Sequence, residues 1–374
     1  MLIFIACLCD STGQKPALHG LAFTVVANVF ALFLGLDETK IRSGLFGFNP
    51  FLAGAGLTFF RVPRDADSPT TIFHDVLIHA FLPCFVVIIQ VGLGGFTNRL
   101  LKSPAFTLPF NMVMMMYISH SYAPGSNYVF YRDGSYTGAT PGGVTNPNVL
   151  LNGPVSPPSS LSTFSFWVDA GFRGFGQVFF ASDTLPGILI FLAIMLYSRL
   201  SSLFGLSATL LGGFWSFFTN TFVDGIRPGL WGFNTVLTGI AFGGVFFCPV
   251  NSRSAVVWLL AVLLSALFQG VINSLSGSAF LLPSGTVGFC LASILVMGMK
   301  DGNGGSGLLF VPDGEGGTPE ENCAKARTRS SGGSSKSKSK SDGSSAAAAE
   351  KKDDDDDGEE KSAMVMREDG SSIL

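Results

Sequence analysis

Residues 44–54 read GLFGFNPFLAG, and residues 229–239 read GLWGFNTVLTG. Seven of the eleven positions are identical, and the third position is aromatic in both copies, Phe46 and Trp231. The copies lie 185 residues apart, about half of the 374-residue chain, which indicates one duplication rather than a short-period array. Each copy lies in an apolar stretch. Duplicated, glycine-broken hydrophobic segments point to a permeation site where two membrane repeats meet.

The composition is that of a membrane protein. Hydrophobic residues make up 47% of the chain and charged residues 13%, whereas soluble domains carry about 25% charged residues. Positions 1–299 hold only 22 of the charged residues, with a net charge of +2. The overall charge of −3 therefore comes from the tail. We expect a polytopic membrane protein, and no basic surface indicates a nucleic-acid partner.

Hydropathy divides the chain into four parts. The first part, 1–120, is a membrane repeat with apolar segments at 1–9, 17–36, 44–60, 72–97 and 104–119. Residues 121–165 form a linker rich in Gly, Pro, Ser and Asn. The second repeat, 166–300, has apolar segments at 166–182, 185–200, 205–223, 229–248, 254–274 and 277–299. Residues 301–374 are a low-complexity tail that we expect to be disordered.

A second motif extends the duplication. Residues 103–110 align with 282–289, because both have Pro, then Thr three residues later, then Phe after three more. In this alignment, segment 1–9 corresponds to 185–200, and no first-half segment corresponds to 166–182. Several segments are shorter than the roughly 20 residues of a full crossing, which predicts broken or re-entrant half-helices. We predict an all-α polytopic membrane protein with two inverted repeats, each of about five transmembrane helices plus a re-entrant segment, and a pore at the repeat interface.

The apolar segments carry few charges. Their carboxylates, Asp75, Asp169, Asp183 and Asp224, all lie near segment ends. Ion pumps and proton-coupled carriers depend on ionisable residues at depth, so this scarcity favours a neutral permeant that moves without coupling.

Uncharged residues are repeated instead. The repeat relates Phe48 to Phe233, Leu52 to Leu237 and Thr107 to Thr286. Two opposed phenyl faces form a flat slot in which a planar polar molecule exchanges its water for hydroxyl and backbone oxygens. An apolar residue in such a segment is most often a packing residue, and this remains the alternative for each side chain taken singly.

Other polar residues favour structural roles. Asn49 and Asn234 follow the Gly-Phe motif, and we favour half-helix caps over contacts to a permeant. His74 and His79 are five residues apart, which does not place both on one helix face, so we expect no metal site. We find no set of residues that predicts a cofactor or an enzyme active site. The end of the chain, Ser372–Leu374, fits a PDZ-type ligand, although such a match is common by chance.

With both motifs, the chain resembles the urea transporter family. The Gly-Leu-aromatic-Gly-Phe-Asn copies are similar to that family's twin motifs, and the Thr107 and Thr286 segments resemble its repeated Leu-Pro-x-x-Thr-x-Pro-Phe signature. Residues 174–180, GFGQVFF, resemble the pore segment of the family's second half. The likeness covers about 1–120 and 166–299.

The resemblance implies a homotrimer in the lipid bilayer, each subunit with its own pore, and passive transport of urea, for which the plasma membrane is the expected location. It implies that Phe48, Leu52, Phe233 and Leu237 line the slot, with Thr107 and Thr286 at its middle. It further implies that Gln177, Val178 and Phe180 frame an outer site. An ion-coupled carrier and a channel for ammonia, water or short amides remain alternatives.

Three departures from the family pattern are visible. Ser103 stands where the pattern has Leu, and Gly288 replaces the Pro of the second signature. The first-half counterpart of Gln177, Val178 and Phe180 is absent, and we therefore expect a further segment upstream of Met1 in the complete gene.

Overall fold

A computed structural model describes most of the chain up to residue 336. The described residues are 2–10, 14–60, 62–63, 69–121, 128–129, 164–219, 225–279, 284–300, 308–311 and 317–336. The chain divides into one unit that ends at Arg327 and a second from Thr328 to Leu374, and of the second unit the structure describes only the end of a helix.

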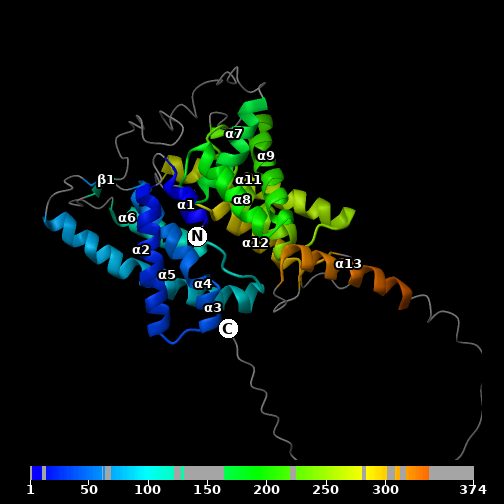
Figure 1. Ribbon diagram of the computed structural model, residues 1–374, viewed down its shortest axis with the longest axis horizontal. Helices are drawn as coiled ribbons and strands as arrows, with labels where there is room; N and C mark the ends of the chain where they lie inside the picture. The colour runs from blue at the N-terminus through cyan, green and yellow to red at the C-terminus, as the bar shows by residue number, and fades with distance from the viewer. Residues whose placement is uncertain are drawn as a thin grey trace, which may run out of the picture. The chain divides into compact units, whose positions relative to one another are not determined.

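Each of the eleven predicted apolar segments contains a helix. The first half has α1 (Leu2–Leu8), α2 (Gln14–Phe33), α4 (Leu45–Phe60), α5 (Pro69–Leu101) and α6 (Leu108–Ser121). The second half has α7 (Phe164–Gln177), α8 (Thr184–Tyr197), α9 (Arg199–Thr219), α10 (Phe233–Ile240) continued by the π-helical turn η4 (Ala241–Val245), α11 (Ser252–Ala279) and α12 (Val287–Gly298). Figure 1 shows the first half in blue and cyan and the second in green and yellow.

Smaller elements were not expected. Helix α3 (Glu38–Arg42) begins after Asp37, whose carboxylate accepts a hydrogen bond from the Thr39 N–H. Two short strands, β1 (Val62–Pro63) and β2 (Tyr128–Val129), pair antiparallel. Helix α13 (Pro319–Lys336) follows the membrane region.

Four helices are long and apolar enough to cross a membrane. They are α2 and α9, which the repeat relates, and α5 and α11, which it also relates. The apolar helices α4, α6, α8, α10 and α12 are shorter. A full crossing needs about 20 residues, so the short helices agree with the prediction that several segments are too short for a full crossing. The protein is an all-α polytopic membrane protein.

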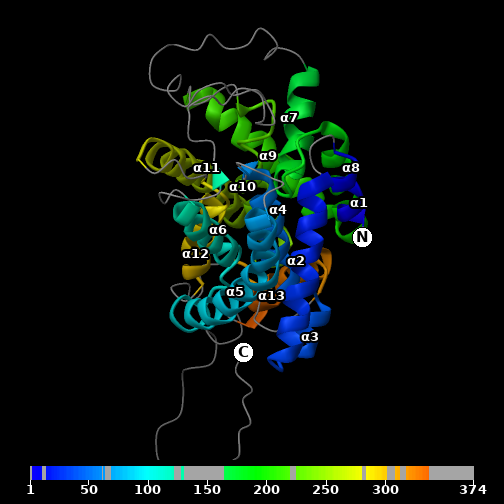
Figure 2. The same ribbon diagram turned by 90° about the vertical axis from the view of Figure 1, so that its left-hand side faces the viewer.

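The same helix contact is present in both repeats. Helix α2 packs against α4, and α9 packs against α10 (Figure 2). A Cβ added at Gly54 would lie 2.6 Å from the His19 carbonyl oxygen, and one at Gly239 would lie 2.7 Å from that of Phe204. Both pairs are related by the offset of 185 residues. Glycine therefore lets the two helix backbones approach closely, as small residues do in membrane proteins.

The tail differs in part from the expectation of disorder from residue 301. Within the first unit, residues 308–311 and the beginning of α13 pack against the second half, and Cys323 and Ala326 are buried. Most of the predicted linker, 121–165, and the proposed PDZ ligand at Ser372–Leu374 lie outside the described residues.

The contact between α7 and α8 gives a test of the fold. A Cβ at Gly187 would overlap the Phe172 carbonyl oxygen, which is backbone and cannot rotate away. We expect Gly187→Ala to destabilise the protein by about 1–3 kcal/mol and to lower the melting temperature in detergent. The matched control is Gly92→Ala in α5, where a Cβ meets nothing within 4 Å. Equal melting temperatures for the two variants would contradict the packing.

Candidate functional site

The two repeated threonines touch each other. Thr107 Oγ1 lies 2.6 Å from Thr286 Oγ1, and both side chains are buried. Thr107 immediately precedes α6, and Thr286 is the N-cap residue of α12. When equivalent residues of two related halves contact one another, the contact lies on the axis that relates the halves. The two threonines that the sequence predicts at the middle of the path therefore lie where the two repeats meet.

The surroundings of this pair are asymmetric. Asn111 Nδ2 donates to Thr286 Oγ1 at 2.9 Å, and Asn111 Oδ1 accepts from the Thr286 N–H at 2.9 Å. Cys290 occupies the repeat position of Asn111, and its sulfur lies 3.1 Å from Thr107 Oγ1. Sequence reasoning missed both residues, although each follows the Phe that ends the second motif. The centre is thus polar and built from hydroxyl, amide and thiol groups.

The turns that carry the threonines have the same backbone shape. Phe106 has a φ of +50°, and its counterpart Gly285 also has a φ of +50°. This left-handed region is unfavourable for a residue with a Cβ, by about 1–3 kcal/mol. The first repeat therefore keeps the turn despite strain, and the second keeps it with glycine.

The turns occupy equivalent positions in the two repeats, and in each repeat a buried pair of amide side chains stabilises the turn. In the first repeat, Asn49 Nδ2 donates to Gln90 Oε1 at 3.2 Å and to the Phe106 carbonyl oxygen at 3.1 Å. In the second repeat, Asn234 Nδ2 donates to Gln269 Oε1 at 3.0 Å and to the Gly285 carbonyl oxygen at 3.2 Å. Each pair joins a short helix to a long one and to the turn before the central threonine.

Each asparagine also caps a helix, although the helix that it caps is not the one in which it lies. Asn49 Oδ1 accepts from the Phe110 N–H of α6 at 3.4 Å, and Asn234 Oδ1 accepts from the Phe289 N–H of α12 at 2.9 Å. The first-turn N–H groups of a helix have no partner within it, so these bonds satisfy donors that water would otherwise have to reach. Gln90 and Gln269 complete the pairs by donating to the Leu45 and Leu230 carbonyl oxygens.

The predicted slot residues have unequal surroundings. Phe233 and Leu237 are partly buried and pack against a cluster that contains Val178, whereas Leu52 is fully buried in another cluster. Phe48, the counterpart of Phe233, is 38% exposed. Residues of α7 and of the turn after it belong to the cluster on which Phe233 and Leu237 pack, and the described first half has no element that matches α7.

The turn after α7 holds the remaining predicted site residues. The Gln177 amide donates to the Pro228 carbonyl oxygen at 3.0 Å, and Val178 is buried. Phe180 has a φ of +60° and contacts the rings of Phe59, Phe60 and Phe110. Phe180 thus packs on rings of the first half, whereas Val178 belongs to the cluster on which Phe233 and Leu237 pack.

A buried carboxylate of the first half stabilises this turn. Asp10, which follows α1, is fully buried and accepts from the Ser182 and Asp183 N–H groups at 2.9 and 2.8 Å. Charged acceptors form stronger hydrogen bonds, and negative charge at the start of α8 is favourable. Sequence reasoning did not identify this residue, because nothing near it in the sequence marks its distant partners.

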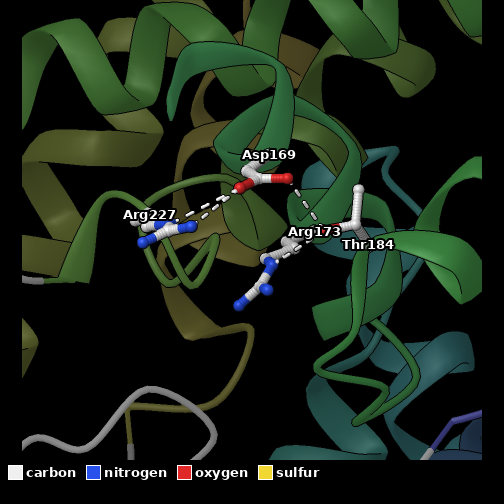
Figure 3. A network of polar contacts seen from close by, with 4 residues as sticks. All are labelled: Asp169, Arg173, Thr184 and Arg227. Carbon is white, nitrogen blue, oxygen red and sulfur yellow. Dashed lines mark hydrogen bonds and ion pairs between the residues drawn. The ribbon is translucent and has the colours of Figure 1, made fainter. Parts of the chain in front are cut away.

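A polar network fixes α7 relative to the segment that enters α10 (Figure 3). Thr184 Oγ1 donates to Asp169 at 3.0 Å and accepts from Arg173 Nε at 3.0 Å, while Arg227 pairs with the other oxygen of Asp169 at 3.3 Å. Because Arg227 and Asp169 are partly exposed, their ion pair contributes at most about 1 kcal/mol. Its role is to position the backbone at Pro228, to which Gln177 bonds.

Among the residues that the structure describes, no group of three or more His, Cys, Asp or Glu side chains lies close enough to hold a metal ion. His74 and Asp75 have no described side chains, and His19 Nδ1 lies 2.6 Å from His79 Nε2.

Comparison with known proteins identifies the family of the chain. A family model described as "Urea transporter" matches residues 1–301. The chain belongs to the urea transporter family. It is 30% identical to urea transporter 1 of Mus musculus over 286 residues, which cover 76% of this chain and 68% of that protein. It is 29% identical to urea transporter 1 of Capra hircus over 316 residues, 83% of this chain and 74% of that protein. The family consists of transporters rather than enzymes.

The amide pairs give a test of how the site is built. In Gln269→Leu, Asn234 Nδ2 loses an acceptor and the Leu230 carbonyl loses a donor, all within buried surroundings. We expect a loss of about 1–3 kcal/mol of stability, measured as a lower melting temperature in detergent. The control is Ser274→Ala on the same helix, whose exposed hydroxyl bonds the Gly270 carbonyl. If both variants have the melting temperature of the wild type, the Asn234–Gln269 pair does not stabilise the site.

Proposed function

We propose that this chain conducts urea passively across a membrane, along an uncharged path between its two inverted repeats. The observation that carries the proposal is the contact of Thr107 with Thr286 on the repeat axis, in a chain of the urea transporter family. The hydrogen-bond partners of this pair, Asn111 and Cys290, are an amide and a thiol. A neutral polar solute is the permeant that such a centre fits.

Urea matches these groups chemically. It is flat, it has four N–H donors and one carbonyl acceptor, and it can exchange hydrogen bonds with hydroxyls and backbone oxygens one at a time. A bare ion would lose its hydration shell beside Thr107 and Thr286 without a compensating charge, which costs several kcal/mol or more. Since the two hydroxyls already bond each other, a passing urea replaces one hydrogen bond with another of similar strength.

We assign the walls of the path by the repeat. Phe48, Leu52, Phe233 and Leu237 line it, and Gln177, Val178 and Phe180 frame one outer site. Packing supports the assignment in the second half, where Val178 shares a cluster with Phe233 and Leu237. Leu52 and Phe180 likewise belong to one cluster.

The proposed assembly is a homotrimer in the plasma membrane, with a pore in each subunit. Helix α2 exposes Leu18, Val25 and Val29 along its length. An apolar face of this kind suits lipid or a neighbouring copy.

The transport mode is tested with the full-length chain in liposomes. We expect stopped-flow urea flux to be proportional to the urea gradient and to be unaffected by imposed proton or sodium gradients, because the side chains that hydrogen-bond the central threonines, Asn111 and Cys290, are an amide and a thiol rather than a carboxylate or a base. Flux that follows an ion gradient would indicate a coupled carrier. Flux of acetamide or water without flux of urea would identify a channel for another neutral solute.

The central threonines are tested by removing one hydroxyl. Thr286→Val leaves Asn111 Nδ2 and Thr107 Oγ1 without their shared partner, and we expect urea flux to fall by about tenfold, the effect of about 1.4 kcal/mol. The control is Thr58→Val, whose hydroxyl bonds the Gly54 carbonyl of its own helix. Both variants are compared at equal protein content. A Thr286→Val flux equal to that of wild type would remove this residue from the path.

A further inference from the structure

Residues 308–311 form a short strand-like contact with the end of the second-half short helix. Phe310 bridges Phe247, the Cys248 N–H donates to the Leu309 carbonyl oxygen at 2.8 Å, and the Val311 N–H donates to the Phe246 carbonyl oxygen at 2.9 Å. This backbone lies directly after η4, which continues α10. The segment therefore contacts the helix that carries Phe233 and Leu237.

The beginning of α13 contacts the same region through side chains. Glu320 Oε1 accepts from Ser198 Oγ at 3.1 Å and from the Leu200 N–H at 3.0 Å. Asn322 Nδ2 donates to the Gly244 carbonyl oxygen at 3.0 Å. Gly244 has a φ of +126°, and a Cβ there would lie 2.6 Å from Pro319 Cβ, so only glycine allows this approach.

Two cysteines meet in the centre of this contact. Cys248 is fully buried and Cys323 is 6% exposed, and both are free thiols. They form one cluster with Ala326, around which Leu200, Leu309 and Val311 pack.

The pair is chemically unequal. The neighbouring Cys248 thiol lowers the pKa of the Cys323 thiol, and Cys323 is also the less deeply buried of the two. The thiolate is the nucleophile of cysteine chemistry, so Cys323 is the thiol that reacts first.

We propose that Cys248 and Cys323 are a redox modification site, at which a peroxide converts the two thiols into a disulfide that fastens residues 308–327 to the end of the α10–η4 helix. The Cys323 thiolate attacks one peroxide oxygen, which breaks the O–O bond, forms a sulfenic acid and releases water after protonation. Cys248 then attacks the sulfenic sulfur, the S–S bond forms, and the hydroxyl leaves as water. Two thiols are oxidised by two electrons in total, and one hydrogen peroxide is reduced to two waters.

The disulfide has a structural consequence near the repeat centre. Phe246, two residues before Cys248, packs its ring on Phe106 with centroids 5.6 Å apart, and Phe106 precedes the central Thr107. In the reduced protein, hydrogen bonds and apolar contacts alone hold the segment. In the oxidised protein, a covalent link closes the chain from residue 248 to 323.

The site is tested on the full-length chain in liposomes. The protein is treated with hydrogen peroxide and denatured in the presence of N-ethylmaleimide, which blocks the remaining thiols, buried ones included, and tryptic peptides are analysed by mass spectrometry. Cys248 is the sole cysteine of peptide 200–253, because trypsin does not cut between Arg227 and Pro228, and Cys323 is the sole cysteine of peptide 301–325. We expect these two peptides to be linked, and dithiothreitol to separate them.

Variants exclude other pairings. Cys248→Ser should lose the link and leave a sulfenic acid on peptide 301–325 that dimedone traps, and Cys323→Ser should lose the link as well. Cys9→Ser, which changes an exposed cysteine, should keep it. Recovery of both wild-type peptides as maleimide adducts at a peroxide dose that oxidises Cys9 would overturn the proposal. Linkage of either cysteine to another partner would overturn it too.

Discussion

The arrangement of this molecule depends on two buried amide pairs, Asn49 with Gln90 and Asn234 with Gln269. Helices α6 and α12 begin inside an apolar region, where water cannot satisfy their first N–H groups, and each unsatisfied group there costs several kcal/mol. Each asparagine accepts one of these N–H groups and donates to the turn before the helix. Both halves contain the same asparagine–glutamine arrangement, so α6 and α12 begin at equivalent positions. The threonines at the starts of these helices therefore meet at the axis that relates the repeats.

This placement has an electrostatic consequence for the centre. Residues 108 and 287 open α6 and α12 directly after the paired threonines, so the positive ends of two helix dipoles lie close to the axis. That field favours a carbonyl oxygen and disfavours a cation. In the proposed path, discrimination against cations therefore needs no charged side chain, which agrees with the scarcity of charged residues in the apolar segments.

The sequence predicted those features that lie within a repeated motif or an apolar segment. Hydropathy predicted the eleven apolar segments that contain helices, and the two aligned motifs predicted that Asn49 and Asn234, and likewise Thr107 and Thr286, occupy equivalent positions. Gln90 and Gln269 were missed, although they share the 179-residue offset of those threonines, because each is a single polar residue in an apolar run without flanking identity. Asp10 and the packed start of α13 were missed for a different reason. Their partners are distant in sequence, and hydrophilic residues such as Glu320 and Asn322 gain their roles only from tertiary contacts.

The asymmetry of the centre gives its hydrogen bonds a direction. Asn111 Oδ1 accepts from the Thr286 N–H, which fixes Nδ2 as the group that donates to the Thr286 hydroxyl. The Thr286 hydroxyl then uses its proton toward Thr107, and the Thr107 hydroxyl uses its own toward the Cys290 sulfur. With these donor and acceptor roles, the proton of each threonine hydroxyl has an acceptor. In the path that we propose, a urea that separates the two threonines would meet a donor at Thr286, which suits its carbonyl, and an acceptor at Thr107, which suits its N–H.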